Sequence, residues 1–410
     1  MLLGGCGSRA QYDVDRLKPA LIANVKTLAG VGAEALPDGD TVNYLLERMP
    51  AAGGLGQLPG RMVHRLLRSR VLDDQRLWND WFMIAVDATE QFSSSQRHCD
   101  QCLVQERSDG TQRYFHIVLE AMLIARNGLV LPLLSVPVRN ESAGYEKQDC
   151  ELKAFYRMAP ELHRRFPQLR LCLLLDSLYF CQEVMDICSE YQWEWIITFK
   201  EGKTPALWKS AQAALAPTHC LERQPNESTQ QRFRWGHNLI HGEQRHRFHV
   251  VFCRETTRSE AGILTVTNFG WGTSLRPDRN NVVELGNHGG RARWKIENEG
   301  FNTLKNSIFG LEHGYGTIHE ALMNWHHLIE VAFILLQLVE HSDIIGKLPP
   351  PPEAARARRS KKPLRLILAR YKTLKNFRET LRHAFLYLRL IMDQVLAFPP
   401  FQFRLAADTA

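Results

Sequence analysis

The feature that most constrains the fold of this chain is a set of short apolar runs between residues 80 and 200. Three runs rich in β-branched and aliphatic residues come first: WFMIAVDATE, YFHIVLEAMLIA and LVLPLLSVPV. Their short connections predict three successive antiparallel strands. A helical stretch, a strand (LRLCLLLDS), a second helix and a further strand (WEWIITFK) follow. This order predicts an α/β fold in which helices pack on a mixed sheet.

Changes in composition divide the rest of the chain into regions. In one segment Gly, Asn, Thr, Arg and aromatic residues mix with short strand-like runs, and in another four prolines precede a basic run. The first pattern predicts a β-rich insertion, and the second a linker that begins stiff and ends cationic. In chain order we expect a mainly helical N-terminal region (1–80), an α/β core (81–201 and 288–345) holding the insertion (202–287), the linker (346–363) and a helical C-terminal tail (364–410).

Composition also limits where the protein works and what it binds. The net charge of +7 favours a polyanionic partner, although many soluble enzymes carry a similar excess. Nine cysteines, an odd number scattered along 410 residues, predict reduced thiols in the cytoplasm rather than a disulfide framework. The opening MLLGGC lacks the basic and apolar regions of a signal peptide, and Leu328–Val339 is too short to cross a bilayer. We therefore expect no membrane anchor.

Two aspartates stand at unusual positions in this pattern. Asp87 and Asp176 each follow an apolar run, in IAVD and LCLLLD, and are expected to end a strand. A carboxylate beside so many apolar residues is costly unless its charge is compensated, and strand ends are where ligands bind in α/β sheets. Either aspartate alone could be a helix N-cap or a turn residue, but two at the ends of adjacent core strands favour a shared site.

A third carboxylate comes from the stretch RWKIENEGFNTLKN, residues 293–306. As an α-helix turning by about 100° per residue, this stretch would form one apolar face of Trp294, Phe301, Leu304 and Ile308. Glu297 would lie within that face, and Glu299 on the opposite side, towards solvent. Arg293 precedes Glu297 by one turn, so a structural ion pair between them is the competing explanation for this glutamate.

Three carboxylates brought together would need a cation. Asp87, Asp176 and Glu297 offer hard oxygen donors of the kind that bind Mg²⁺ or Mn²⁺. Phosphoryl-transfer enzymes use such clusters to hold two metal ions about 4 Å apart, one at the attacking and one at the leaving oxygen. The sequence therefore predicts a site for two divalent ions.

This arrangement of two strand aspartates and a helix glutamate resembles the DDE transposases of bacterial insertion sequences. The stretch RWKIE (293–297), followed by Phe301, Leu304 and Lys305, looks like the subgroup with a Tyr–Arg–Glu–Lys signature. That subgroup carries a β-rich insertion between the second Asp and the Glu, as expected here. Further stretches resemble one branch of the family: GLEHGYG (310–316), His98 to Cys102, and Tyr114 to His116. The resemblance spans roughly residues 80–340.

The signature is altered at two positions. The family's Tyr lies three residues before the Arg, where this chain has Gly290. The family's Lys lies seven residues after the Glu, where this chain has Leu304, with Lys305 one residue further. A local bulge or a shift at Gly300 would absorb the extra residue.

The resemblance implies an RNase H-like core and a catalytic triad of Asp87, Asp176 and Glu297. It implies Mg²⁺-dependent cleavage at the ends of a transposable element and strand transfer into target DNA. The substrate would be double-stranded DNA, and the protein would act as a dimer in the DNA-bound complex. Two other functions stay open: an inactive, DNA-binding relic of a transposase, and a related RNase H-like nuclease.

Basic and aromatic residues are expected to contact the DNA. Arg293 would orient Glu297 or bind phosphate. Arg65 and Arg68 lie on the polar side of a predicted helix. This side either contacts DNA phosphates or is an ordinary solvated helix face. The predicted DNA-contacting residues are Arg293, Trp294, Lys305, Arg65 and Arg68.

A CxxC motif, Cys99 to Cys102, remains outside this function. With His98 or His116, and with Cys150, it could bind zinc. No second CxxC motif or spaced histidine pair accompanies it, so the sequence favours two free thiols in a β-turn over a structural zinc site at Cys99, Cys102 and His116.

Overall fold

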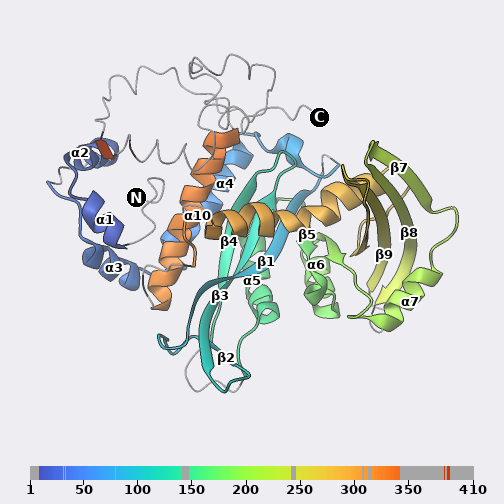
Figure 1. Cartoon of the computed structure of the whole chain (residues 1–410), viewed down its shortest axis with the longest axis horizontal. Coiled ribbons are helices and arrows are strands. Elements are labelled where there is room, and N and C mark those ends of the chain that lie inside the picture. Colours follow the sequence, from blue (N-terminus) through green and yellow to red (C-terminus); the bar gives the residue numbers. More distant parts are fainter. Residues whose placement is uncertain are drawn as a thin grey trace, which may run out of the picture.

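The computed structural model describes residues 9–30, 32, 34–78, 80–140, 147–241, 246–306, 309–312, 316, 318–341, 383, 386 and 387. The expected linker (346–363) and nearly all of the expected C-terminal tail (364–410) lie outside these residues. The described part is a mixed α/β fold, as predicted, in which one large sheet is flanked by helices (Figure 1).

The sheet has ten strands in the order β2-β3-β1-β5-β6-β10-β9-β8-β7, and β4 also pairs with β3. Two neighbouring pairs, β1 with β5 and β5 with β6, are parallel, whereas β1 and β4 are both antiparallel to β3. The strands are β1 Phe82–Ser94, β2 Leu103–Glu106, β3 Gln112–Ile124, β4 Val130–Val138, β5 Leu171–Leu175, β6 Glu194–Thr198, β7 Cys220–Asn226, β8 Thr229–His241, β9 His246–Arg258 and β10 Leu264–Thr273.

The three predicted antiparallel strands are β1, β3 and β4, and the two strands predicted after them are β5 and β6. The short strand β2 was not predicted, because its apolar run is too brief to stand out from a loop. The helices are α1 Arg9–Asp15, α2 Pro19–Ala29, α3 Gly39–Arg48, α4 Leu58–Arg68, α5 Glu151–Arg165, α6 Gln182–Glu190, α7 Pro205–Ala213, α8 Val282–Glu284, α9 Asn302–Asn306 and α10 His319–His341.

Strand alternation gives the sheet two apolar faces. On one face Ile84 and Val86 of β1 pack with α4, α5 and α6, and we call this cluster the α5-side core. On the other face Met83 and Ala85 pack with α10 and with the helical residues 282–306, and we call it the α10-side core. Figure 1 shows α10 and this helical segment lying across the sheet. A sheet covered on both sides explains why the core strands are apolar runs rather than alternating sequences.

The β-rich segment expected at 202–287 extends the core sheet instead of forming a sheet of its own. It contributes α7 and the antiparallel strands β7–β10. β10 pairs with β6 through Trp271↔Thr198, Gly272↔Ile197 and Thr273↔Ile196. The open edge of β6 is thereby covered, which removes a row of unpaired backbone groups.

The segment that carries Glu297 is helical but irregular. After α8 it passes through a π turn (Leu285–Gly289) and a 3₁₀ turn (Gly290–Arg293). A second π turn (Ile296–Phe301) leads into α9. Because a π turn takes up one residue more than an α turn, the chain has a local bulge between Glu297 and Lys305, an irregularity of the kind expected there.

The last described helix, α10, is long and apolar enough to cross a membrane by length and composition alone. However, 72% of its most apolar window is buried inside the protein. Such burial is typical of a core helix. The run Leu328–Val339, expected to be too short to cross a bilayer, is therefore part of a helix of sufficient length that lies mostly in the core.

Candidate active site

The strand register brings the two predicted aspartates together. β1 and β5 run parallel, with Ala85 paired to Leu174. The same register, continued by two residues, sets Asp87 opposite Asp176, at the point where β5 ends. Along β1 and β5, successive residues point alternately to the two apolar cores. This alternation places Asp87 and Asp176 on the side of the sheet that carries α10 and Glu297.

Asp87 does not end its strand, so that part of the prediction was wrong. β1 continues to Ser94 because β3 keeps pairing with it, and Asp87 is paired with Glu120. The side chain is 19% exposed, and its Oδ1 accepts the Ala88 N–H at 3.0 Å. The site is therefore at the end of β5, beside the middle of β1.

Arg293 connects Asp87 to Glu297. Its Nη1 donates to Asp87 Oδ2 at 3.1 Å, and its Nη2 donates to Glu297 Oε1 at 2.6 Å. The arginine is buried, with its Nε left without a hydrogen-bond partner among the described residues. The ion pair expected as the competing explanation for Glu297 is thus present, but it also includes the strand aspartate.

Asp87 is the carboxylate whose protonation is most perturbed. Burial raises its pKa to about 7, and the negative charges of Glu297 and Glu151 act in the same direction. The Arg293 guanidinium lowers the pKa but does not outweigh burial. An acid in this state is half protonated near neutral pH, and a cation bound beside it would displace the proton.

Asp176 also serves as the N-cap considered for it from the sequence. Its Oδ1 accepts the Leu178 N–H at 2.6 Å and begins a 3₁₀ turn, Ser177–Tyr179. The cap orients the carboxylate while using one oxygen, so its second oxygen is the one available to a ligand.

Glu151 is a fourth carboxylate of the site that the sequence did not reveal. It is the first residue of α5, and its Oε1 accepts the hydroxyl of the buried Tyr179 at 2.7 Å. Burial raises its pKa despite the tyrosine hydrogen bond, and the charge of Asp176 raises it further. An acidic residue at a helix start is common, because it interacts well with the helix dipole, so nothing marked it as a site residue.

The helical-wheel prediction was wrong for Trp294 and overstated the burial of Glu297. Trp294 is 52% exposed, and the Glu297 side chain is 40% exposed at the edge of the α10-side core. Glu299 is exposed, as predicted. A wheel of 100° per residue loses its phase where 3₁₀ and π turns replace the α-helix. The residues that face the core are Ala292, Arg293, Ile296, Gly300, Phe301 and Leu304.

The altered signature position has a packing explanation. A Cβ at Gly290 would lie 2.4 Å from the ring of Trp271, which is buried. The indole therefore fills the space beside the backbone at this position, and a tyrosine cannot be accommodated without moving it.

The other predicted DNA contacts are not gathered at the carboxylates. Lys305 pairs with Glu312 at 2.9 Å. Arg65 and Arg68 are exposed on α4, as predicted, but α4 packs through Val63 and Leu66 into the α5-side core. α4 also contacts α10, and the ion-pair partners of Asp87 and Glu297 include neither arginine.

Next to Asp87 the structure has a buried polar cluster that the sequence did not predict. Glu120, the strand partner of Asp87, is bonded to His326 Nε2 of α10. Glu330 accepts the Ser135 hydroxyl at 2.5 Å and contacts His327 Nδ1 at 2.7 Å. Burial raises the pKa of Glu120 to about 7, with Glu330 contributing. Burial lowers the pKa of His326, but the neighbouring Glu120 outweighs it, and the net shift is upward.

The compact groups of metal-ligating side chains among the described residues are Cys99–Cys102–His116 and Glu120–His326–Glu330, each with donor atoms within 4.8 Å of one another. The predicted triad is more open, with Arg293 between Asp87 and Glu297. Its oxygen donors suit hard divalent cations, whereas the Arg293 guanidinium already offsets part of their negative charge. Comparisons with protein-family models and with curated proteins found no match for this chain.

Proposed function

We propose that this protein is a DDE transposase, which cleaves DNA at the ends of a transposable element and joins them to target DNA. The observation that carries the proposal is the link from Asp87 through Arg293 to Glu297, with Asp176 directly after β5, the strand that runs parallel to β1. Three antiparallel strands followed by two parallel ones support the RNase H-like core that the resemblance implies.

The residues fit the divalent ions that this function needs. Asp87, Asp176 and Glu297 would hold two Mg²⁺ or Mn²⁺ ions, with Glu151 beside them. The raised pKa of Asp87 reflects burial and nearby carboxylates that a single guanidinium does not offset, so added positive charge is favoured there. When bound, such ions activate the attacking oxygen and stabilise the leaving oxygen of a phosphodiester.

The protein's own groups would position the reacting parts. Arg293 holds the Asp87 and Glu297 carboxylates in fixed directions, and the turn after β5 does the same for Asp176. Tyr179 fixes Glu151. Preorganised groups of this kind lower the barrier because they need not reorient during the reaction.

The proposed partner is double-stranded DNA, first the element ends and then the target, bound by a dimer in the cytoplasm. A net charge of +7 supports a polyanionic partner. The exposed Trp294 adjoins Arg293 and could contact DNA next to the carboxylates. An inactive DNA-binding relic is the second candidate, favoured by the absence of the signature tyrosine at Gly290.

The test compares Glu297→Gln with Glu299→Gln on duplex DNA carrying the sequences that flank the coding region. We expect the unaltered protein to cleave this DNA in Mg²⁺ or Mn²⁺. Glu297→Gln should lower the rate by more than about 100-fold, since even groups that only support metal ligands contribute 10–100-fold. Glu299→Gln should retain activity.

Each other result has a defined meaning. DNA binding without cleavage by the unaltered protein would support the relic. Cleavage of DNA that lacks the flanking sequences would support a general nuclease. Equal rates for Glu297→Gln and the unaltered protein would rule out the proposed triad.

A further inference from the structure

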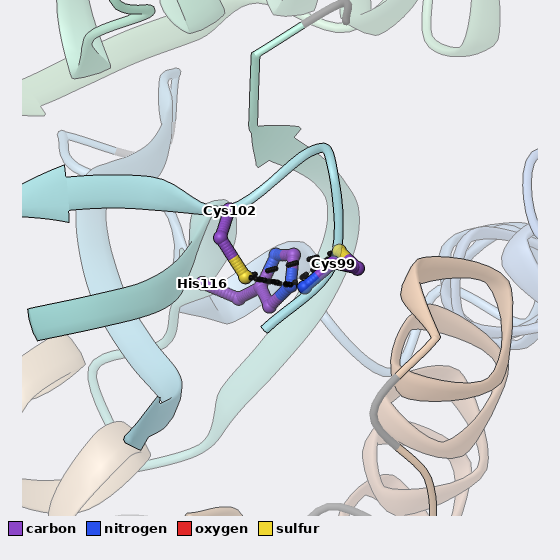
Figure 2. Close-up of side chains that lie close together, drawn as sticks. All are labelled: Cys99, Cys102 and His116. Atoms are coloured by element: carbon purple, nitrogen blue, oxygen red, sulfur yellow. Dashed lines mark hydrogen bonds between the residues drawn. The ribbon is translucent and has the colours of Figure 1, made fainter. Parts of the chain in front are cut away.

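A second group of ligating side chains lies further along β3, four residues from Glu120, the strand partner of Asp87. Cys99 and Cys102 belong to the connection between β1 and β2, and His116 belongs to β3, where it pairs with Phe92. Figure 2 shows the two thiols and the imidazole pointing towards one another. Cys102 and His116 are buried, and Cys99 is partly buried.

The distances between the three donor atoms match those around a tetrahedral zinc ion. The two sulfur atoms are 3.8 Å apart. Zinc bound to sulfur at about 2.3 Å requires a sulfur–sulfur distance of roughly 3.8 Å. His116 Nε2 lies 3.3 Å from Cys99 Sγ and 3.2 Å from Cys102 Sγ. Tetrahedral zinc requires about 3.5 Å for this pair, so a side-chain shift of roughly 0.3 Å would complete the fit.

A backbone hydrogen bond also helps to fix the positions of the two thiols. The Cys99 N–H donates to Cys102 Sγ at 3.3 Å. Cys150, which the sequence also offered as a ligand, is exposed at the start of α5 and lies outside the group.

We propose that Cys99, Cys102 and His116 bind a structural zinc ion, separate from the carboxylate site. The observations that carry this proposal are the three donor distances and the burial of the group. Three protein ligands leave one tetrahedral position for a water molecule or a further side chain. The zinc would fasten the β1–β2 connection to β3, near the start of α10, where the His319 ring lies 5.9 Å from that of His116.

The proposal predicts one zinc ion per chain in protein purified after growth with zinc, measured by elemental analysis. Replacing both thiols, with Cys99→Ser and Cys102→Ser together, should remove this zinc. The matched control, Cys150→Ser, should keep it. Zinc held instead by Glu120, His326 and Glu330 would survive the double replacement, and that result would overturn the proposal.

A second measurement uses the unaltered protein, so that it does not depend on whether the variants fold. Removing zinc with a chelator and adding Co²⁺ should give the absorption bands of thiolate-bound cobalt, with one equivalent at saturation. Two results would overturn the proposal: a chain that takes up no metal under reducing conditions, or a Cys99–Cys102 disulfide in freshly purified protein. Neither measurement involves DNA, so the zinc site and the transposase can fail independently.

Discussion

Arg293 shows how one residue sets the charge balance of the candidate site. Its guanidinium is shared between Asp87 and Glu297, so neither carboxylate has a cation to itself. Burial therefore dominates at Asp87 and raises its pKa to about 7, far above the ordinary value of 3.8. The proton on this acid should compete with any bound divalent ion.

This competition gives a pH prediction for Asp87. Mg²⁺ binding should strengthen as the pH rises through about 7, and each binding event should release close to one proton at pH 6 but almost none at pH 8. Calorimetric titrations in buffers with different ionisation enthalpies measure this proton release. Asp87→Asn should abolish it, whereas release that is the same at both pH values would show that Asp87 does not titrate near 7.

The raised pKa of Asp87 also affects how the stability of the metal-free protein depends on pH. Because the pKa of Asp87 is higher in the folded than in the unfolded protein, the folded state binds more protons between pH 4 and pH 7. This carboxyl thus makes the metal-free protein less stable as the pH rises through that range. Asp87→Asn should weaken that part of the pH dependence.

At the scale of elements, the sequence predicted well where one periodicity holds and poorly where it changes. The apolar runs of β1, β3, β4, β5 and β6 predicted the core, because a strand buried on both faces has a distinctive composition. In the segment 285–301 the helical wheel gave wrong side-chain directions, because the turns there are 3₁₀ and π rather than α. The wheel placed Trp294 on the wrong side and set Glu297 deeper in the apolar face than its 40% exposure allows.

The π turn at Ile296–Phe301 should be required for the direction of Glu297. Deleting Asn298, an exposed residue of this turn, should restore an α-helical turn and rotate Glu297 by about 100° relative to Leu304. We expect the deletion to lower DNA cleavage by more than about 100-fold, as loss of a metal ligand would. Circular dichroism should confirm that the protein still folds.

Asn298→Ala is the control for this deletion, because it keeps the number of residues in the turn. It should change the free energy of unfolding by no more than about 0.5 kcal/mol and leave cleavage intact. Full activity in the deletion variant would mean that the π turn is not needed to orient Glu297.

At the scale of the whole molecule, what the sequence missed depends on contacts between distant segments. Glu151 joins the site because α5 begins beside the end of β5. Glu120 and His326 are 206 residues apart and meet only when α10 packs on β3. A single buried charge can be suspected from its apolar neighbours, but its partner cannot be assigned without the tertiary structure.

The Glu120–His326 contact therefore tests how α10 is attached to the sheet. Both side chains are fully buried, so His326→Leu would leave the Glu120 carboxylate without its cation. Breaking one partner of a buried pair costs about 3–5 kcal/mol, whereas replacing both partners is often close to neutral. We expect urea unfolding to show a loss of this size for His326→Leu and partial recovery when Glu120→Leu is added. If the double variant were no more stable than His326→Leu alone, the pairing would not be what holds α10 beside Asp87.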